Sequence, residues 1–130
     1  MHGQKRIQMN WTLINHFKSH EFDSPDEPGS GERMQESTVL MFDEAREHAG
    51  IAFDMSSGVR TPAHNLKVGG VEGSAHIEGW AGDVVAHSGT QKYKIVSALL
   101  FAGFNRIGIS KTFIHADNDP TKPSAVIWTY

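Results

Sequence analysis

The spacing of apolar residues along the chain predicts two helices. The first covers about residues 34–49 and the second covers about residues 90–102. In both segments, apolar residues recur every three or four positions, which places them on one face of a helix. Gly50 and Gly103 follow directly, and glycine often stands just past the last turn of a helix.

Short stretches rich in alternating or β-branched residues predict strands at 51–57, 81–86, 106–110, 112–117 and 125–129. Two regions rich in glycine, proline and polar residues, 21–31 and 58–79, are expected to be loops, and a loop as long as the second is typical of a functional segment. This order of elements predicts an α+β fold, in which helices pack on a small, mostly antiparallel sheet.

The length of 130 residues fits one domain, 1–130, in which residues 1–10 are expected to be a loosely ordered lead-in. With a net charge of −3, the chain offers no basic surface for nucleic acid. The absence of cysteine excludes disulfides, thiolate zinc sites and a cysteine nucleophile.

No long apolar run follows the early cations Lys5 and Arg6. We therefore expect no signal peptide and no membrane insertion. The compartment is left undecided: without a leader, the protein is expected to stay in the cytoplasm until another component releases or exports it. The oligomeric state is left open.

Three residues have the chemistry of a metal site. His76 precedes the predicted strand 81–86, Asp83 lies within it, and His115 lies in the strand 112–117. Two imidazoles and a carboxylate are three ligands of a catalytic zinc, whose fourth position binds water. Spacing alone favours a solvated histidine and a strand-end aspartate over a metal site. A set of two histidines and an aspartate would also accept other first-row metals. Asp117 shares a strand face with His115.

Several motifs in order resemble the zinc D-Ala-D-Ala carboxypeptidase family, the M15 peptidoglycan peptidases, in its small single-domain phage and bacterial branch. They are Ser57-Gly58-Val59-Arg60-Thr61-Pro62, the Gly69-Gly70 loop, the segment from Ser74 through Asp83, and Phe113-Ile114-His115-Ala116-Asp117. The resemblance covers about residues 11–130 and implies a fold like that of hedgehog proteins and DD-peptidases.

The resemblance also implies roles. His76, Asp83 and His115 match the ligands of one Zn²⁺ per chain, and Arg60 matches the arginine that binds the substrate and polarises its carbonyl group. Ser74 is expected to hydrogen-bond within the site or to substrate, or else to cap a local turn. The implied activity is hydrolysis of peptidoglycan peptides, as a carboxypeptidase or as an endolysin-type endopeptidase.

Two positions depart from the family pattern. Val59 stands where relatives carry an aromatic residue, and Thr112 stands where many relatives carry an acidic general base. Asp117 is the candidate to replace that base, or else a partner that orients a ligand histidine, or only the first residue of the turn Asp117-Asn118-Asp119-Pro120. Glu78 is a more distant candidate for the base. The missing acid leaves an alternative open: a weak or inactive zinc-containing module that binds cell wall. A phage structural component with a lytic domain is a third possibility.

Overall fold

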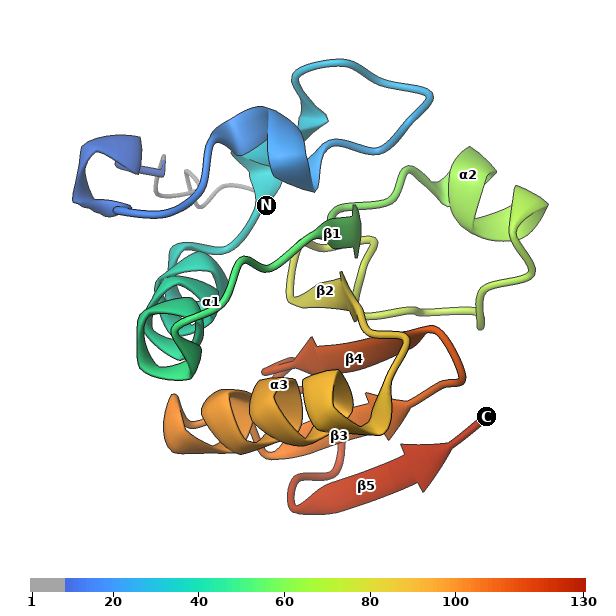
Figure 1. The fold of residues 1–130 in the computed structure, drawn as a ribbon. Coiled ribbons are helices and arrows are strands. Elements are labelled where there is room, and N and C mark those ends of the chain that lie inside the picture. The colour runs from blue at the N-terminus through green and yellow to red at the C-terminus, as the bar shows by residue number, and fades with distance from the viewer. Residues whose placement is uncertain (1–8) are drawn as a thin grey trace.

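A five-stranded sheet organises the chain in the computed structural model, which describes residues 9–130 (Figure 1). The strands are β1 (Met55–Ser57), β2 (Ala81–Val85), β3 (Arg106–Ile109), β4 (Phe113–Asp117) and β5 (Val126–Thr129). Their order in the sheet is β1-β2-β4-β3-β5, and every pair is antiparallel except β3 with β5. The predicted α+β fold with a mostly antiparallel sheet is confirmed.

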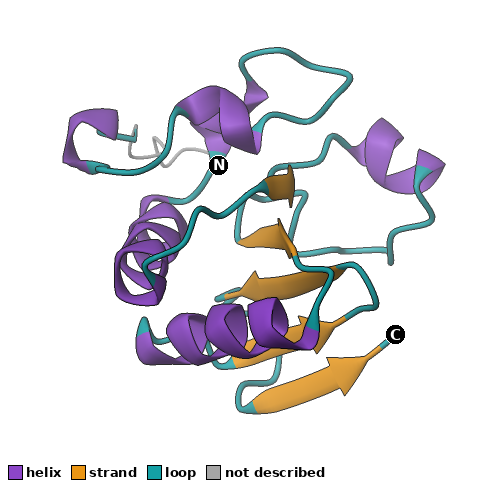
Figure 2. Cartoon of the chain, in the orientation of Figure 1, coloured by secondary structure: helices purple, strands orange, loops and turns teal. Residues whose placement is uncertain are grey.

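Two long helices pack against each other and cover one face of this sheet (Figure 2). They are α1 (Glu36–Ala49) and α3 (Gly89–Phe101), close to the predicted ranges. The Ser88 hydroxyl and the Gln91 side chain form a capping box at the start of α3. Gly50 ends α1 with a φ of 68°, a left-handed conformation that favours glycine. None of the helices within residues 9–130 is long and apolar enough to cross a membrane.

The predicted loop 58–79 contains a third helix, α2 (Pro62–Lys67), so the prediction of loop throughout this region is wrong. The Thr61 hydroxyl accepts a hydrogen bond from the His64 backbone N–H, and Pro62 occupies the first helical position. A threonine cap followed by proline is a strong start signal for a helix, and here it outweighs the glycine-rich composition that follows.

Other predicted boundaries also shift. Only residues 55–57 of the predicted strand 51–57 belong to the sheet, because Phe53 turns into the core between α1 and β1. The predicted loop 21–31 overlaps two 3₁₀ helices, Ser19–Phe22 and Ser30–Arg33. Of the predicted lead-in 1–10, residues 1–8 lie outside the described residues, and Met9 is buried.

The alternation of side chains along the strands gives the sheet two different faces. Val84 of β2, Ile107 of β3 and Ile114 of β4 are fully buried in the core beneath α1 and α3. Successive side chains in a strand point to opposite faces. Asp83 and His115, one position away from these core residues, therefore lie on the face away from the two helices.

Candidate metal centre

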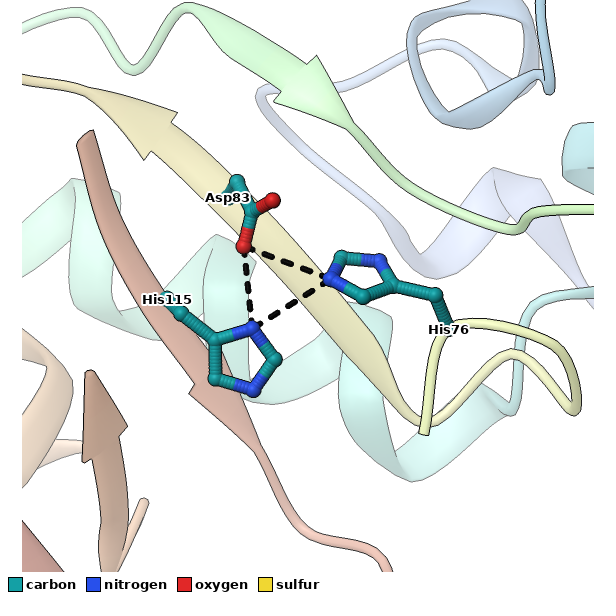
Figure 3. Close-up of side chains that lie close together, drawn as sticks. All are labelled: His76, Asp83 and His115. Carbon is teal, nitrogen blue, oxygen red and sulfur yellow. Dashed lines mark hydrogen bonds and ion pairs between the residues drawn. The ribbon is translucent and has the colours of Figure 1, made fainter. Parts of the chain in front are cut away.

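His76, Asp83 and His115 come together on the sheet face away from α1 and α3 (Figure 3). Asp83 and His115 are directly opposite one another in the register of β2 and β4. His76 reaches the same point from the turn that precedes β2. All three residues are buried, with exposed fractions of 2%, 4% and 7%. The structure thus brings together the three residues that the sequence suggested as ligands.

The three donor atoms have the spacing of a tetrahedral site. Nε2 of His76 lies 3.3 Å from Nδ1 of His115 and 3.3 Å from Oδ1 of Asp83. Nδ1 of His115 lies 2.9 Å from the same oxygen. A tetrahedral zinc with bonds of about 2.0–2.1 Å needs ligand atoms about 3.3–3.4 Å apart. Two edges match this requirement and the third is slightly shorter, so the donor set fits zinc.

Hydrogen bonds on the far side of each imidazole leave the correct nitrogen free for a metal. Nδ1 of His76 lies 2.7 Å from the Gly58 carbonyl oxygen, which can only accept, so this nitrogen carries the proton. Nε2 of His115 lies 2.7 Å from Oδ2 of Asp117, which favours a proton there. Both lone pairs, on His76 Nε2 and His115 Nδ1, then point at Asp83. Such outer partners are typical of metal-ligating histidines.

Within the triad of His76, Asp83 and His115, the charged forms of Asp83 and His115 stabilise one another. Burial alone would raise the pKa of Asp83, but the adjacent imidazoles of His76 and His115 lower it far below its ordinary value. Burial alone would lower the pKa of His115, but hydrogen bonds and charge from Asp117 and Asp83 raise it. Asp83 is therefore a carboxylate at any ordinary pH, as a metal ligand must be.

Arg60 lies beside the metal ligands. Its Nη2 is 3.4 Å from Oδ2 of Asp83, the oxygen that does not face the histidines, and its Nε donates to the Ser57 hydroxyl at 3.1 Å. Its side chain is largely buried. The guanidinium is thus a fixed positive charge next to the candidate ligand set.

Asn65 supports Arg60, a role that the sequence reading missed. Its Oδ1 accepts from Arg60 Nη1 at 3.2 Å, and its Nδ2 donates to the Val71 carbonyl. A Cβ at Gly70 would overlap Oδ1 of Asn65. The glycine pair at 69–70 therefore lets the chain after α2 close tightly around Asn65. The signal available in the sequence was the position of Asn65, five residues after Arg60 and close to the motif Ser57–Pro62.

Ser74 and the candidate bases take different positions. The Ser74 hydroxyl accepts from the His76 backbone N–H at 3.2 Å, so it supports the turn that carries His76. Asp117 is buried, and it bonds to His115 and, through Oδ1, to Arg106 Nε at 2.7 Å. Thr112 and Glu78 are exposed and are not among the residues that line the cavity beside the triad.

The sequence also matches a known protein family. The model of the family Peptidase M15 matches residues 13–117, which is well over half of the chain and includes the whole triad. The chain belongs to the peptidase M15 family. A comparison with curated proteins gives no match.

In this member of the M15 family, the triad opens on a cavity of about 630 Å³. Arg60, Ser74 and Asp117 line it together with the three candidate ligands. Aromatic side chains from the end of the sheet complete its wall: Phe113, Trp128 and Tyr130. A cavity of this size lies within the usual range of ligand-binding sites in proteins.

Proposed function

We propose that this M15 peptidase is a zinc enzyme that hydrolyses peptide bonds in peptidoglycan stem peptides or cross-links. The observation that carries the proposal is the donor set of His76, Asp83 and His115, which has near-tetrahedral spacing and opens on a cavity of about 630 Å³. Three protein ligands and an open fourth position are typical of a catalytic zinc rather than a structural one. Family membership supports peptide hydrolysis.

Each residue has a part in this proposal. A zinc ion held by His76 Nε2, Asp83 Oδ1 and His115 Nδ1 would lower the pKa of bound water and polarise a carbonyl group. Arg60, fixed by Ser57, Asn65 and Asp83, orients the substrate carbonyl and stabilises negative charge that develops on its oxygen. Ser74 holds the turn of His76 and faces the same cavity.

For Asp117, the contacts support the role of a histidine partner over that of a general base. Its Oδ2 accepts from His115, and its Oδ1 accepts from Arg106 and from the Asp119 backbone N–H at 3.2 Å. A general base needs an oxygen free to take a proton from water. With both oxygens occupied, Asp117 acts by orienting His115 and increasing its basicity.

One observation favours a second candidate function, a zinc-containing module that binds cell wall without efficient hydrolysis. The carboxylates that line the cavity within the described part of the chain are Asp83 and Asp117, and both are engaged. Thr112 is exposed and lies outside the cavity lining. Relatives with an acid at the position of Thr112 have a proton acceptor there. Neither Asp83, Asp117 nor Thr112 evidently replaces it.

The decisive experiment measures turnover of muramyl peptides by the purified protein with and without a chelator. We expect hydrolysis that stops on chelation, returns with Zn²⁺, and falls by about 100-fold or more in His76→Ala, since loss of a ligand removes the metal. His87→Ala, at an exposed histidine, is the matched control and should keep full activity.

The products separate the open alternatives. Release of a single terminal residue identifies a carboxypeptidase, and release of cross-linked or stem fragments identifies an endopeptidase. Full activity in the presence of chelator, or in His76→Ala, contradicts the zinc mechanism. One zinc per chain, retention on sedimented peptidoglycan and no turnover across the peptide panel would establish the binding module instead.

A further inference from the structure

Arg106 is an arginine outside the motifs that suggested the site, yet it contacts the site's outer carboxylate. It stands at the start of β3, one residue before Ile107, which pairs with Ala116 of β4. This register brings Arg106 beside Asp117. Its Nε donates to Oδ1 of Asp117 at 2.7 Å, and its side chain is only 13% exposed. A buried arginine–carboxylate bond of this kind restrains both partners.

Two further contacts hold the guanidinium in place. Nη1 donates to the Pro123 carbonyl in the connection between β4 and β5. The guanidinium carbon lies 5.2 Å from the centre of the Trp128 ring, in a cation–π contact. Trp128 in turn lies 5.4 Å from the His115 ring. Arg106 is therefore part of the wall that surrounds His115.

Gly108 provides room for this arrangement. It is the residue opposite His115 in the register of β3 and β4. A Cβ at this position would come within 2.6 Å of the Trp128 indole nitrogen. The absent side chain lets the indole lie over the strand between Arg106 and His115.

The contacts form a continuous path from β3 to the metal-facing nitrogen. Arg106 binds one oxygen of Asp117, and the other oxygen accepts from Nε2 of His115 at 2.7 Å. A proton held at Nε2 leaves Nδ1 available to a metal. Asp117 is 1% exposed, so loss of its arginine partner would leave a buried carboxylate free to rotate and poorly compensated.

We propose that Arg106 is a positioning residue of the metal centre: it fixes Asp117, and through Asp117 it holds His115 with Nδ1 directed at the metal. This inference rests on the proposed metal site, but it concerns metal affinity and histidine orientation rather than the choice of substrate.

The test compares the zinc affinity of variants by competition with a chromogenic chelator at one fixed pH. We expect Arg106→Gln to weaken zinc binding by about 10- to 100-fold, the usual cost of losing an outer partner of a metal ligand. Arg46→Gln is a matched control, because Arg46 also donates to a backbone carbonyl and lies over an aromatic ring, Phe17, away from the site. It should bind zinc as the wild type does.

A double-mutant cycle separates positioning from general stabilisation. If Arg106 acts through Asp117, adding Arg106→Gln to Asp117→Asn should weaken zinc binding less than twofold further. Arg106→Lys, which keeps the charge but not the fork of donors, should recover part of the affinity. In zinc-loaded protein, the His115 Nε2–H signal in nitrogen-15 spectra should exchange faster in Arg106→Gln than in Arg46→Gln.

Additive losses in the cycle, or equal affinity and equal exchange in Arg106→Gln and Arg46→Gln, would overturn the proposal. These readouts need no substrate. A wild-type protein that binds zinc but hydrolyses no peptide contradicts the proposed peptidase activity and leaves the role of Arg106 to be decided by the variants.

Discussion

At the scale of single residues, Nδ1 of His115 can bind either a proton or a metal ion, and the two compete for it. His115 lies between two carboxylates, 2.9 Å from Asp83 and 2.7 Å from Asp117, which together raise its pKa above the ordinary value of 6.5 despite burial. A group whose pKa is raised by folding stabilises the fold below its unfolded pKa, and this contribution is lost as pH rises through the folded pKa.

We therefore predict opposite pH trends for metal-free and zinc-loaded protein. The free energy of unfolding of chelator-treated protein should decrease as pH rises above 6.5, because the imidazolium of His115 loses its proton. The extra stability conferred by zinc should increase over the same range, because zinc binds only deprotonated Nδ1. Denaturant titrations at several pH values measure both. His115→Gln should remove most of each trend, and parallel slopes in the wild type would contradict the assignment.

Thr112 allows a second prediction for a single residue. Its side chain is exposed and is not part of the cavity lining, so a carboxylate there would not reach the candidate metal centre. Thr112→Glu should change kcat/KM on muramyl peptides less than about threefold, whereas a working general base contributes about 100-fold or more. The variant should be assayed with Lys111→Glu, a charge change at the neighbouring exposed position. A large gain confined to Thr112→Glu would show that this position still serves catalysis.

At the scale of elements, most of the fold could be predicted from the pattern of apolar residues. The ranges of α1 and α3 follow from their amphipathic spacing and the glycines after them, and β4 follows from its alternation. Thr61 and Pro62 also mark the start of α2 in the sequence. The glycines that follow suggested a loop, so this six-residue helix was not predicted. The helix forms because the Thr61 side chain caps its first turn, and the prediction from glycine content was therefore wrong.

The candidate site was predictable only as far as its motifs extend. His76, Asp83, His115 and Arg60 belong to stretches that resemble a family. The contact of Arg106 with Asp117 depends on the pairing of β3 with β4, which follow one another in the chain, and on the register that places Ile107 opposite Ala116. The predicted strand ranges 106–110 and 112–117 did not fix this register, and a shift of one residue would turn Arg106 to the other face of the sheet.

The loop that follows α2, which contains Gly69 and Gly70, gives a prediction at this scale. Gly70→Ala would place a methyl group onto Asn65 Oδ1 and so displace the residue that holds Arg60. We expect kcat/KM to fall by about 10- to 100-fold, as for a misplaced substrate-orienting group, with zinc content unchanged. Gly89→Ala is the control, because a Cβ there meets no atom within 4 Å. Loss of zinc along with activity would mean that the loop supports the metal ligands instead of Arg60.

At the scale of the whole molecule, the two faces of the sheet have different roles: one packs against the core and the other carries the candidate metal centre. The apolar core lies between the sheet and the pair α1 and α3, where Phe42, Leu99 and Ile114 are fully buried. The candidate metal centre lies on the other face, on side chains that alternate with core positions. A core on one face can form without a metal, whereas small zinc domains that lack such a core unfold when the metal is removed.

We therefore predict that the chelated protein stays folded, with helical circular dichroism and a cooperative thermal transition. Zinc ties the turn of His76 to β2 and β4, so at about 100 times its dissociation constant it should add about 2.7 kcal/mol. For a domain of this length, that corresponds to a rise in Tm of about 10 °C. Hydrogen exchange should slow mainly around residues 74–83 and 113–117, while α1 and α3 are protected in both states. An equal rise in His76→Ala would show that zinc acts elsewhere, and unfolding on chelation would show that the core depends on the metal.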